Sequence, residues 1–276
     1  SQAWALQKAL RELKLTDKVL GIDESSVKAL LDERQIDAQV RPAENTIRRI
    51  RLSKSPAELK LMRLSAQQNV DAAVATAQAV REVETTRELR ARFYSEAALR
   101  GNLGVYMVIN GTSSELVNEP IREGMAFSVD CVSSCRFYHG DFARTIFVGE
   151  PHPKMREVCD AIAVAWREIQ EHLRAGLRFA DVTRLGRESI KKQGLDLNVG
   201  FTPHAVGLFH TDHPRPSLHE PRTVDGLVLE ENMVLSVDCP VLEAGIGGSA
   251  HLEDLMLIKK NGAEPIHDVP PGVFVV

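Results

Sequence analysis

Acidic residues at the ends of largely apolar segments are the residues of this sequence best suited to chemistry. Asp130 follows the segment 126–129, and Asp238 follows the segment 234–237. A carboxylate inside a buried strand is unfavourable unless a cation or a hydrogen-bond donor accompanies it. A surface position at a strand end would explain one such aspartate, whereas two in matching contexts favour a shared site.

The two segments also resemble each other. Residues 122–131 read REGMAFSVDC and residues 230–239 read EENMVLSVDC, so Asp130 and Asp238 lie 108 positions apart in matching places. Chance similarity between two strands is one explanation, and duplication of a half-domain is the other. In a duplication the equivalent strands lie about a pseudo-twofold axis, and the two aspartates would face each other across one site.

Each half carries a second acid. Asp141 lies 11 residues after Asp130, a spacing that allows a hairpin to return it beside the first aspartate. Glu253 lies 15 residues after Asp238, and the glycines between positions 245 and 248 can form the turn. Four converging carboxylates repel one another unless cations lie between them, so the pattern predicts a site for divalent metal ions.

Histidines would add nitrogen donors to such a site. His204, His210, His213 and His219 fall within 16 residues. The context GFTPHAVG predicts that His204 points inward from a strand or a turn. A histidine-rich surface loop and a structural zinc site are the alternatives, but the paired cysteines of a specific zinc site are missing.

The elements that must position these residues alternate between helices and strands. We expect helices over 2–14, 25–34, 56–81, 86–100 and 153–175, and a further helix capped by Asp181. Strands are expected over 18–23, 36–40, 105–110, 125–130 and 144–148, with strand and turn character over 200–276. The sequence Ser55-Pro56-Ala57-Glu58 is typical of a capping box at a helix start.

Residues 1–47 are too few to bury a core of their own. We therefore interpret them as the C-terminal remnant of a smaller N-terminal α/β domain, and residues 48–276 as the main domain. Residues 48–55 are basic and polar and would form the boundary. Because the sequence begins with Ser1, we expect a fragment or a processed chain.

Composition excludes several classes of protein. The chain has 276 residues, of which 43% are hydrophobic and 26% charged, as in an ordinary folded protein. The net charge of −4 and the absence of a long basic run argue against nucleic-acid binding. No apolar stretch approaches the roughly 18 residues of a membrane span, and residues 1–10 have no signal-peptide layout.

Cysteine usage indicates a reducing compartment. Four cysteines are too few for a disulfide scaffold, so we expect free thiols and a cytoplasmic location. Cys131 and Cys239 each follow one of the paired aspartates. Successive residues of a strand point to opposite faces, so we expect both thiols to pack in the core rather than to bind metal.

Five segments together resemble the pita-bread (M24-type) metallopeptidases, which include Xaa-Pro dipeptidase (prolidase), aminopeptidase P, methionine aminopeptidase and creatinase. In the family's order over about residues 48–270, they are IRLSKSPAELKLMRLSAQ, VDCVSSCRFYHGDFARTIFVGEP, PHAVGLFH, LEENMVLSVDCP and HLEDLMLIKKNGAEPI. The resemblance is to the prolidase and aminopeptidase P branch. It implies an α/β (α+β) pita-bread fold with two pseudo-twofold-related halves.

The resemblance also implies a metal centre. Its ligands would be Asp130, Asp141, His204, Asp238 and Glu253. Asp141 and Glu253 would bridge two divalent ions, which could be Mn²⁺, Co²⁺ or Zn²⁺. A hydroxide shared by two ions about 3.5–4 Å apart would attack the peptide carbonyl.

The resemblance further implies catalytic roles and a substrate. Asp238 would carry the proton to the leaving nitrogen, and His210 or else His213 would support the oxyanion. The expected substrate is a short proline-containing peptide, cut at its Xaa-Pro bond. The expected assembly is a homodimer without nucleic-acid or membrane partners.

Several positions depart from the family's pattern. Asp238 stands where the family has Glu, and His251 stands where the prolidase branch has Arg. Residues 113–118 contain no histidine that could contact the substrate, and Cys131 replaces the usual Gly. The metal shell is mostly retained while the substrate shell is changed. Two alternatives therefore stay open: a creatinase-like hydrolase or metal-dependent lyase, and a catalytically silent binding protein.

Overall fold

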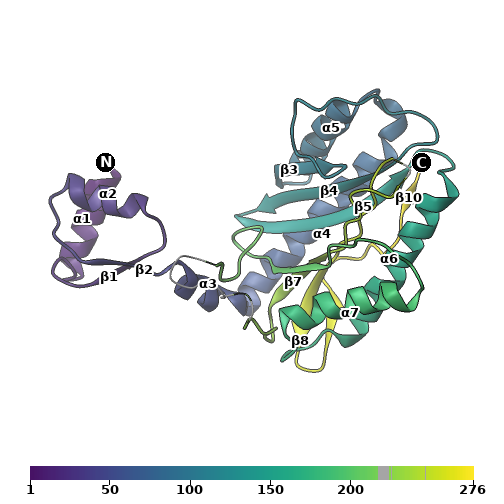
Figure 1. The fold of residues 1–276 in the computed structure, drawn as a ribbon. Helices are drawn as coiled ribbons and strands as arrows, with labels where there is room; N and C mark the ends of the chain where they lie inside the picture. Colours follow the sequence, from purple (N-terminus) through teal and green to yellow (C-terminus); the bar gives the residue numbers. More distant parts are fainter. Residues whose placement is uncertain (217–223, 225, 246) are drawn as a thin grey trace. The chain divides into compact units, whose positions relative to one another are not determined.

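The computed structural model describes residues 1–216, 224, 226–245 and 247–276, and these divide into two compact units. Residues 1–51 and 213–216 belong to the first unit, and the other described residues, from 52 onward, belong to the second. Figure 1 follows the chain through both units by colour. Among the described residues, no helix has the length and apolar character needed to cross a membrane.

The first unit is a small α/β arrangement. Its elements are α1 (Gln2–Glu12), β1 (Leu20–Ile22), α2 (Ser26–Glu33), β2 (Val40–Pro42) and α3 (Glu44–Leu52), and its two strands pair in parallel. The expectation that residues 1–47 bury no core of their own is wrong, because the buried side chains of Leu10, Leu31, Ile36 and Ala38 form a small one.

Helix α3 runs through the first half of the segment 48–55 and ends at Leu52, and the two units divide between residues 51 and 52. The charges of α3 suit a helix. Glu44 lies in its first turn and Arg49 and Arg51 lie in its last, which complements the helix dipole.

The second unit contains two four-stranded sheets, with strand orders β10-β5-β4-β3 and β6-β7-β8-β9. Its helices are α4 (Pro56–Gln78), η1 (Val80–Glu82), α5 (Thr86–Leu99), α6 (Pro153–His172) and α7 (Phe179–Lys192). Its strands are β3 (Leu103–Ile109), β4 (Ala126–Cys135), β5 (Tyr138–Phe147), β6 (Thr202–Ala205), β7 (Val234–Asp238), β8 (Leu255–Lys259), β9 (Gly262–Pro265) and β10 (Phe274–Val275). The mixed α/β class predicted from the sequence is confirmed.

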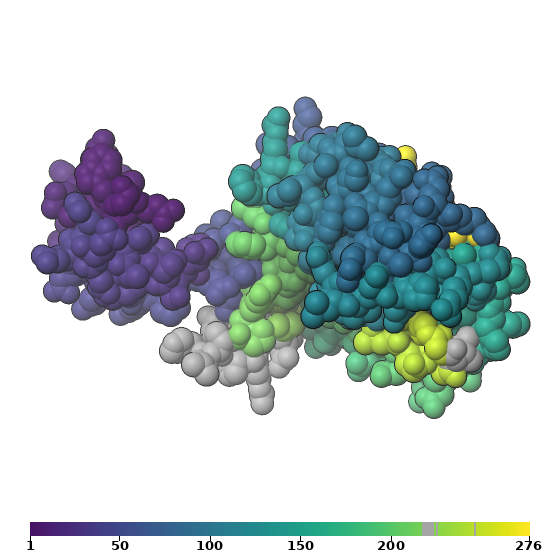
Figure 2. All heavy atoms as spheres, turned by 90° about the horizontal axis from the view of Figure 1, so that it is seen from above, coloured from purple at the N-terminus to yellow at the C-terminus, as the bar shows by residue number. Residues whose placement is uncertain are grey.

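Two large cores lie on the sheets of this unit, and a third, smaller cluster packs Met62 and Ala66 of α4 against β7 and β8. One core joins α4 and α5 to β3, β4 and β5, and the other joins α6 and α7 to β6, β7 and β8. The two halves also contact each other, since β10 pairs with β5 in parallel. In Figure 2, the blue-to-teal atoms of the first half lie directly against green and yellow atoms of the second.

The start of helix α4 follows the sequence signal. Ser55 and Glu58 form the predicted capping box, with Pro56 at the first helical position. The helix then lies very close to strand β5. A Cβ atom on Gly140 would come within 2.6 Å of the Asn69 Cβ atom, so a side chain there would force the two elements apart.

The prediction that Asp181 caps a helix is wrong. Helix α7 begins at Phe179 with Arg178 as its N-cap, so Asp181 lies inside the first turn. There its carboxylate accepts hydrogen bonds from the Arg178 guanidinium at 2.8 and 2.9 Å. A negative charge in the first turn stabilises the helix as a cap would, which is why the sequence signal was displaced by only a few residues.

The predicted packing of the cysteines is confirmed. Cys131 and Cys239 are fully buried, one in the core of each half. All four cysteines are free and buried.

Candidate metal centre

A long hairpin brings the first two acids together. Strands β4 and β5 pair over ten positions, with Asp130 opposite Ala143 and Asp141 opposite Val132. Asp141 is therefore two residues from the partner of Asp130, and both side chains leave the same face of the sheet. The predicted hairpin is confirmed, and its strands are longer than expected because buried residues such as Phe142 extend the pattern.

The second sheet supplies a histidine and a third acid. In the ladder between β6 and β7, His204 lies opposite Ser236. Asp238 is two residues beyond Ser236, at the end of β7, and so lies on the same face. The inward direction predicted for His204 agrees with its exposure of only 5%.

Glu253 reaches the site in a way the sequence did not predict. We expected it on a strand that returns beside Asp238, but it precedes β8 and forms an isolated bridge with Ala143 of β5. The backbone N–H of Glu253 donates to the Ala143 carbonyl at 3.1 Å, and the N–H of Ala143 donates back at 3.3 Å. The last acid is therefore held by a strand of the first sheet.

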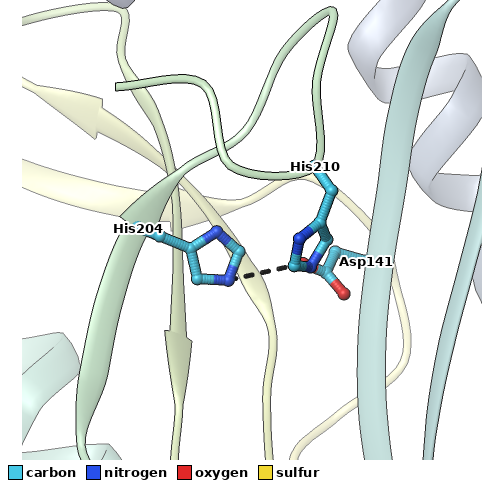
Figure 3. A group of neighbouring side chains, drawn as sticks. All are labelled: Asp141, His204 and His210. Atoms are coloured by element: carbon cyan, nitrogen blue, oxygen red, sulfur yellow. Dashed lines mark ion pairs between the residues drawn. The ribbon is translucent and has the colours of Figure 1, made fainter. Parts of the chain in front are cut away.

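His204 joins the acids of both sheets. Its Nε2 atom lies 3.5 Å from Asp141 Oδ2, 3.2 Å from Asp238 Oδ2 and 3.5 Å from Glu253 Oε1. His210, in the loop after β6, places its Nε2 atom 3.0 Å from Asp141 Oδ2. Figure 3 shows both imidazole rings directed toward Asp141. These contacts make one continuous site.

The donors form two adjoining groups, each with its donor atoms within 4.8 Å of one another. The first group consists of Asp141, His204 and His210, and the second of Asp130, Asp238, His251 and Glu253. The five residues predicted as ligands are thus gathered in one place. His210, expected to support an oxyanion, also lies within donor range of Asp141.

Sequence reasoning did not identify His251 as a donor. The available signal was its place two residues before Glu253, since an extended chain directs such a pair to the same face. His213 belongs to neither donor group and falls in the first unit. His219 lies outside the described residues.

Burial and mutual repulsion set the charges of the acids. Burial, together with the nearby charges of Asp141 and Asp238, raises the pKa of Asp130 well above its usual value. The same causes raise the pKa of Glu253. Burial would also raise the pKa of Asp238, but its contacts with His204 and His251 outweigh burial and lower that pKa.

The pKa of His204 also depends on the balance between burial and neighbouring charges. Burial alone would lower it, but the neighbouring carboxylates of Asp238 and Glu253 outweigh burial and raise it well above its usual value. The charge state of each group thus depends on its direct neighbours across the site.

Unsatisfied polar atoms make this donor set suitable for metal ions. Seven buried atoms of the donor residues have no hydrogen-bond partner: Asp130 Oδ1, both Asp141 oxygens, both His204 nitrogens, His251 Nε2 and Glu253 Oε2. Buried polar atoms are rarely left unpaired, because each costs free energy. Carboxylates combined with imidazoles fit divalent ions of hard or borderline character.

A buried ion pair supports Glu253 from behind. The Arg144 guanidinium donates to the Glu253 carbonyl at 2.9 Å and to Asp254 Oδ1 at 2.6 Å. Trp166 Nε1 donates to Asp254 Oδ2 at 2.9 Å, so the Asp254 carboxylate is bound from two sides. Ser236 Oγ donates a short hydrogen bond to Glu253 Oε1. Backbone and side chain of Glu253 are both fixed.

The chain belongs to metallopeptidase family M24, whose sequence model matches residues 60–260. It is 26% identical to the Xaa-Pro dipeptidase of Pyrococcus horikoshii over 90% of this chain and 72% of that protein. The family assignment agrees with the resemblance drawn from the five motifs. It makes the chain a member of a family of metal-dependent hydrolases.

Solved structures with the same fold support the assignment. The X-Pro aminopeptidase of Thermotoga maritima superposes with a TM-score of 0.83 at 20% identity, covering 100% of this chain and 80% of that one. The Xaa-Pro dipeptidase of Bacillus anthracis superposes with a TM-score of 0.80 at 24% identity, covering 99% and 78%. The predicted pita-bread fold is therefore confirmed.

Proposed function

We propose that this chain is a dinuclear metal-dependent exopeptidase that hydrolyses the Xaa-Pro bond of short peptides. The observation that carries the proposal is the position of His204 Nε2, within 3.5 Å of acids from both sheets. His204 joins the two donor groups into one site, and together they have enough donor atoms for two ions. The similarity to an Xaa-Pro dipeptidase supports the choice of substrate.

The residues would divide between two ions. Asp141 and His204 would hold one ion, Asp130 and Asp238 the other, and Asp141 and Glu253 would bridge them. When bound, divalent ions such as Mn²⁺, Co²⁺ or Zn²⁺ lower the pKa of water and polarise a carbonyl group.

Two other side chains would act on the substrate. Asp238 has 23% of its side chain exposed, whereas Asp141 and Glu253 have none, so Asp238 can pass a proton to the leaving nitrogen. His210 is also more accessible than His204, with 30% exposed, and would stabilise the oxyanion.

We also propose a homodimeric, cytoplasmic enzyme. The four free, buried cysteines support a reducing compartment. Sedimentation equilibrium of the purified chain tests the dimer directly.

Metal stoichiometry and a matched pair of peptides test the main proposal. The wild type, Asp141→Asn and the exposed control Asp160→Asn are incubated with Mn²⁺ and desalted, and metal per chain is measured. We expect two ions in the wild type and the control and fewer in Asp141→Asn. We also expect hydrolysis of Ala-Pro but not Ala-Ala, with at least about a 100-fold loss of rate in Asp141→Asn.

Other outcomes separate the alternatives. Two bound ions with turnover of amidine or sulfonium compounds, and none of Xaa-Pro peptides, would indicate a creatinase-like hydrolase or a lyase. Two bound ions without any turnover would indicate a binding protein. A wild type that binds fewer than two ions would overturn the dinuclear mechanism.

A further inference from the structure

His251 is held rigidly beside the second donor group. Its backbone N–H donates to Thr145 Oγ1 at 3.0 Å, and the Thr145 hydroxyl donates to the His251 carbonyl at 3.3 Å. Thr145 is buried and lies on β5, two residues from the Ala143 that pairs with Glu253. The same strand therefore fixes both His251 and Glu253.

The imidazole of His251 points at carboxylates. Its Nε2 atom lies 3.3 Å from Asp238 Oδ1 and 3.8 Å from Glu253 Oε2. The residue is only 8% exposed, and Nε2 is buried without a hydrogen-bond partner. A nitrogen in that position has two uses: it can carry a proton toward the acids, or it can give its lone pair to a cation between them.

The composition of the group favours the second use. Asp130, Asp238 and Glu253 place three carboxylates within 4.8 Å of this nitrogen, and a single proton on the imidazole would offset only one of their charges. A divalent ion offsets two, and a neutral imidazole then ligates that ion instead of competing with it.

We propose that His251 is a metal ligand of the second donor group. The inference rests on the proposed dinuclear function and deepens it. Each ion then has an imidazole among its ligands, His204 for the first and His251 for the second. Imidazole nitrogen suits borderline ions such as Zn²⁺, Co²⁺ or Fe²⁺, whereas all-oxygen sites suit Mg²⁺ and Mn²⁺. The second position should therefore take Co²⁺ or Zn²⁺ in preference to Mn²⁺.

Binding of Co²⁺ to the whole chain tests the assignment. Titration calorimetry and the visible absorption of Co²⁺ follow both ions in the wild type, His251→Ala and His251→Arg. Arginine keeps a positive charge beside Asp238 but has no lone pair to donate. We expect one ion to be retained in both variants and the affinity for the other to fall roughly 100-fold or more, beyond the effect of losing a supporting residue.

Two further measurements identify the cause. Added imidazole should restore the second ion in His251→Ala, where it leaves a gap, but not in His251→Arg. The control is His172→Ala, because His172 is exposed at the end of helix α6 and belongs to neither donor group. It should bind both ions. In the wild type, the proton spectrum of the Co²⁺ form should contain shifted His251 signals, an observation that does not depend on any variant folding.

The outcomes distinguish the two proposals. Wild-type protein that binds fewer than two ions contradicts the dinuclear function itself. Wild-type protein that binds two ions, with His251→Arg binding them equally well, overturns only this inference and makes His251 an ion-pair partner of Asp238. Equal affinity of the second position for Mn²⁺ and Co²⁺ would contradict the predicted preference.

Discussion

The two copies of the repeated segment share a sequence but differ in how the chain continues. In the first copy, β4 runs five residues beyond Asp130 to Cys135 and pairs with β5 throughout. In the second copy, β7 ends at Asp238, and Pro240 follows, which has no N–H to continue a ladder. The first copy therefore builds its second acid into a hairpin, whereas the second copy depends on a bridge from β5 to position Glu253.

The two repeated aspartates also differ in charge. Burial and neighbouring acids raise the pKa of Asp130, while the contacts with His204 and His251 overcome burial and lower the pKa of Asp238. The matching sequence thus places the two carboxylates at equivalent points of their strands, and the residues around each set its pKa. The second copy is complete only with support from the first.

Removing the support for Glu253 should have the largest effect. Arg144 is 1% exposed and paired with Asp254, so Arg144→Met leaves this buried carboxylate with only His267 and Trp166 as partners. We expect the free energy of unfolding, measured in urea, to fall by about 3–5 kcal/mol. The control is Arg156→Met, which breaks an exposed pair with Glu150 and should cost about 1 kcal/mol or less. Equal losses would show that the second copy does not depend on this contact.

The serines of the repeat provide a second comparison. Ser236 donates to Glu253, whereas Ser128 contacts the hydroxyl of Ser249 at 2.5 Å. Ser236→Ala should weaken metal binding by tenfold to 100-fold, roughly the effect of losing a residue that supports a ligand. Ser128→Ala, the matched change in the other copy, should alter it much less. Calorimetric titration with Co²⁺ measures both, and similar losses would mean that the two serines have the same role.

Neutralising each repeated aspartate should change stability in opposite directions. In protein freed of metal with a chelator, Asp130→Asn removes a charge that its neighbours repel and should stabilise the fold by about 1–2 kcal/mol. Asp238→Asn removes the partner of two histidines and should destabilise it by a similar amount, about 1–2 kcal/mol. Thermal unfolding measures both. Shifts of the same sign would contradict the difference between the two copies.

The stability of the metal-free protein should depend on pH in a way that reflects the raised pKa values. Because Asp130 and Glu253 hold protons more tightly when folded, the free energy of unfolding should fall as pH rises above the usual carboxyl range. The raised pKa of His204 acts in the same direction.

The lowered pKa of Asp238 acts in the opposite direction, and its contribution is lost only as pH falls below the usual carboxyl range. Each group with a raised pKa contributes a slope of at most about 1.4 kcal/mol per pH unit. Urea unfolding at about pH 6 and about pH 8 measures it. Metal should suppress the slope, because it competes with these protons. A metal-free protein with maximal stability above neutral pH would contradict this prediction.

Local signals predicted the parts of the site that depend on one strand or one turn. The hairpin between Asp130 and Asp141 followed from spacing, and the capping box at Ser55 followed from residue type. The direction of His251 did not follow, because Thr145 of a different strand sets it. The bridge from Ala143 to Glu253 is non-local in the same way. The contacts of β5 with His251 and Glu253 could therefore not be predicted from the sequence pattern, which reports only local structure.

Two buried thiols next to the site can report how often each half of the molecule opens. Cys131 and Cys239 each follow one of the repeated aspartates and are fully buried, and burial raises the pKa of both thiols. Only thiolate reacts with alkylating reagents, so each cysteine can be modified only when its own strand opens. The alkylation rate of each thiol, followed by mass spectrometry, therefore reports how often that half of the molecule opens locally. The similar segments thereby place one probe of local opening next to each repeated aspartate.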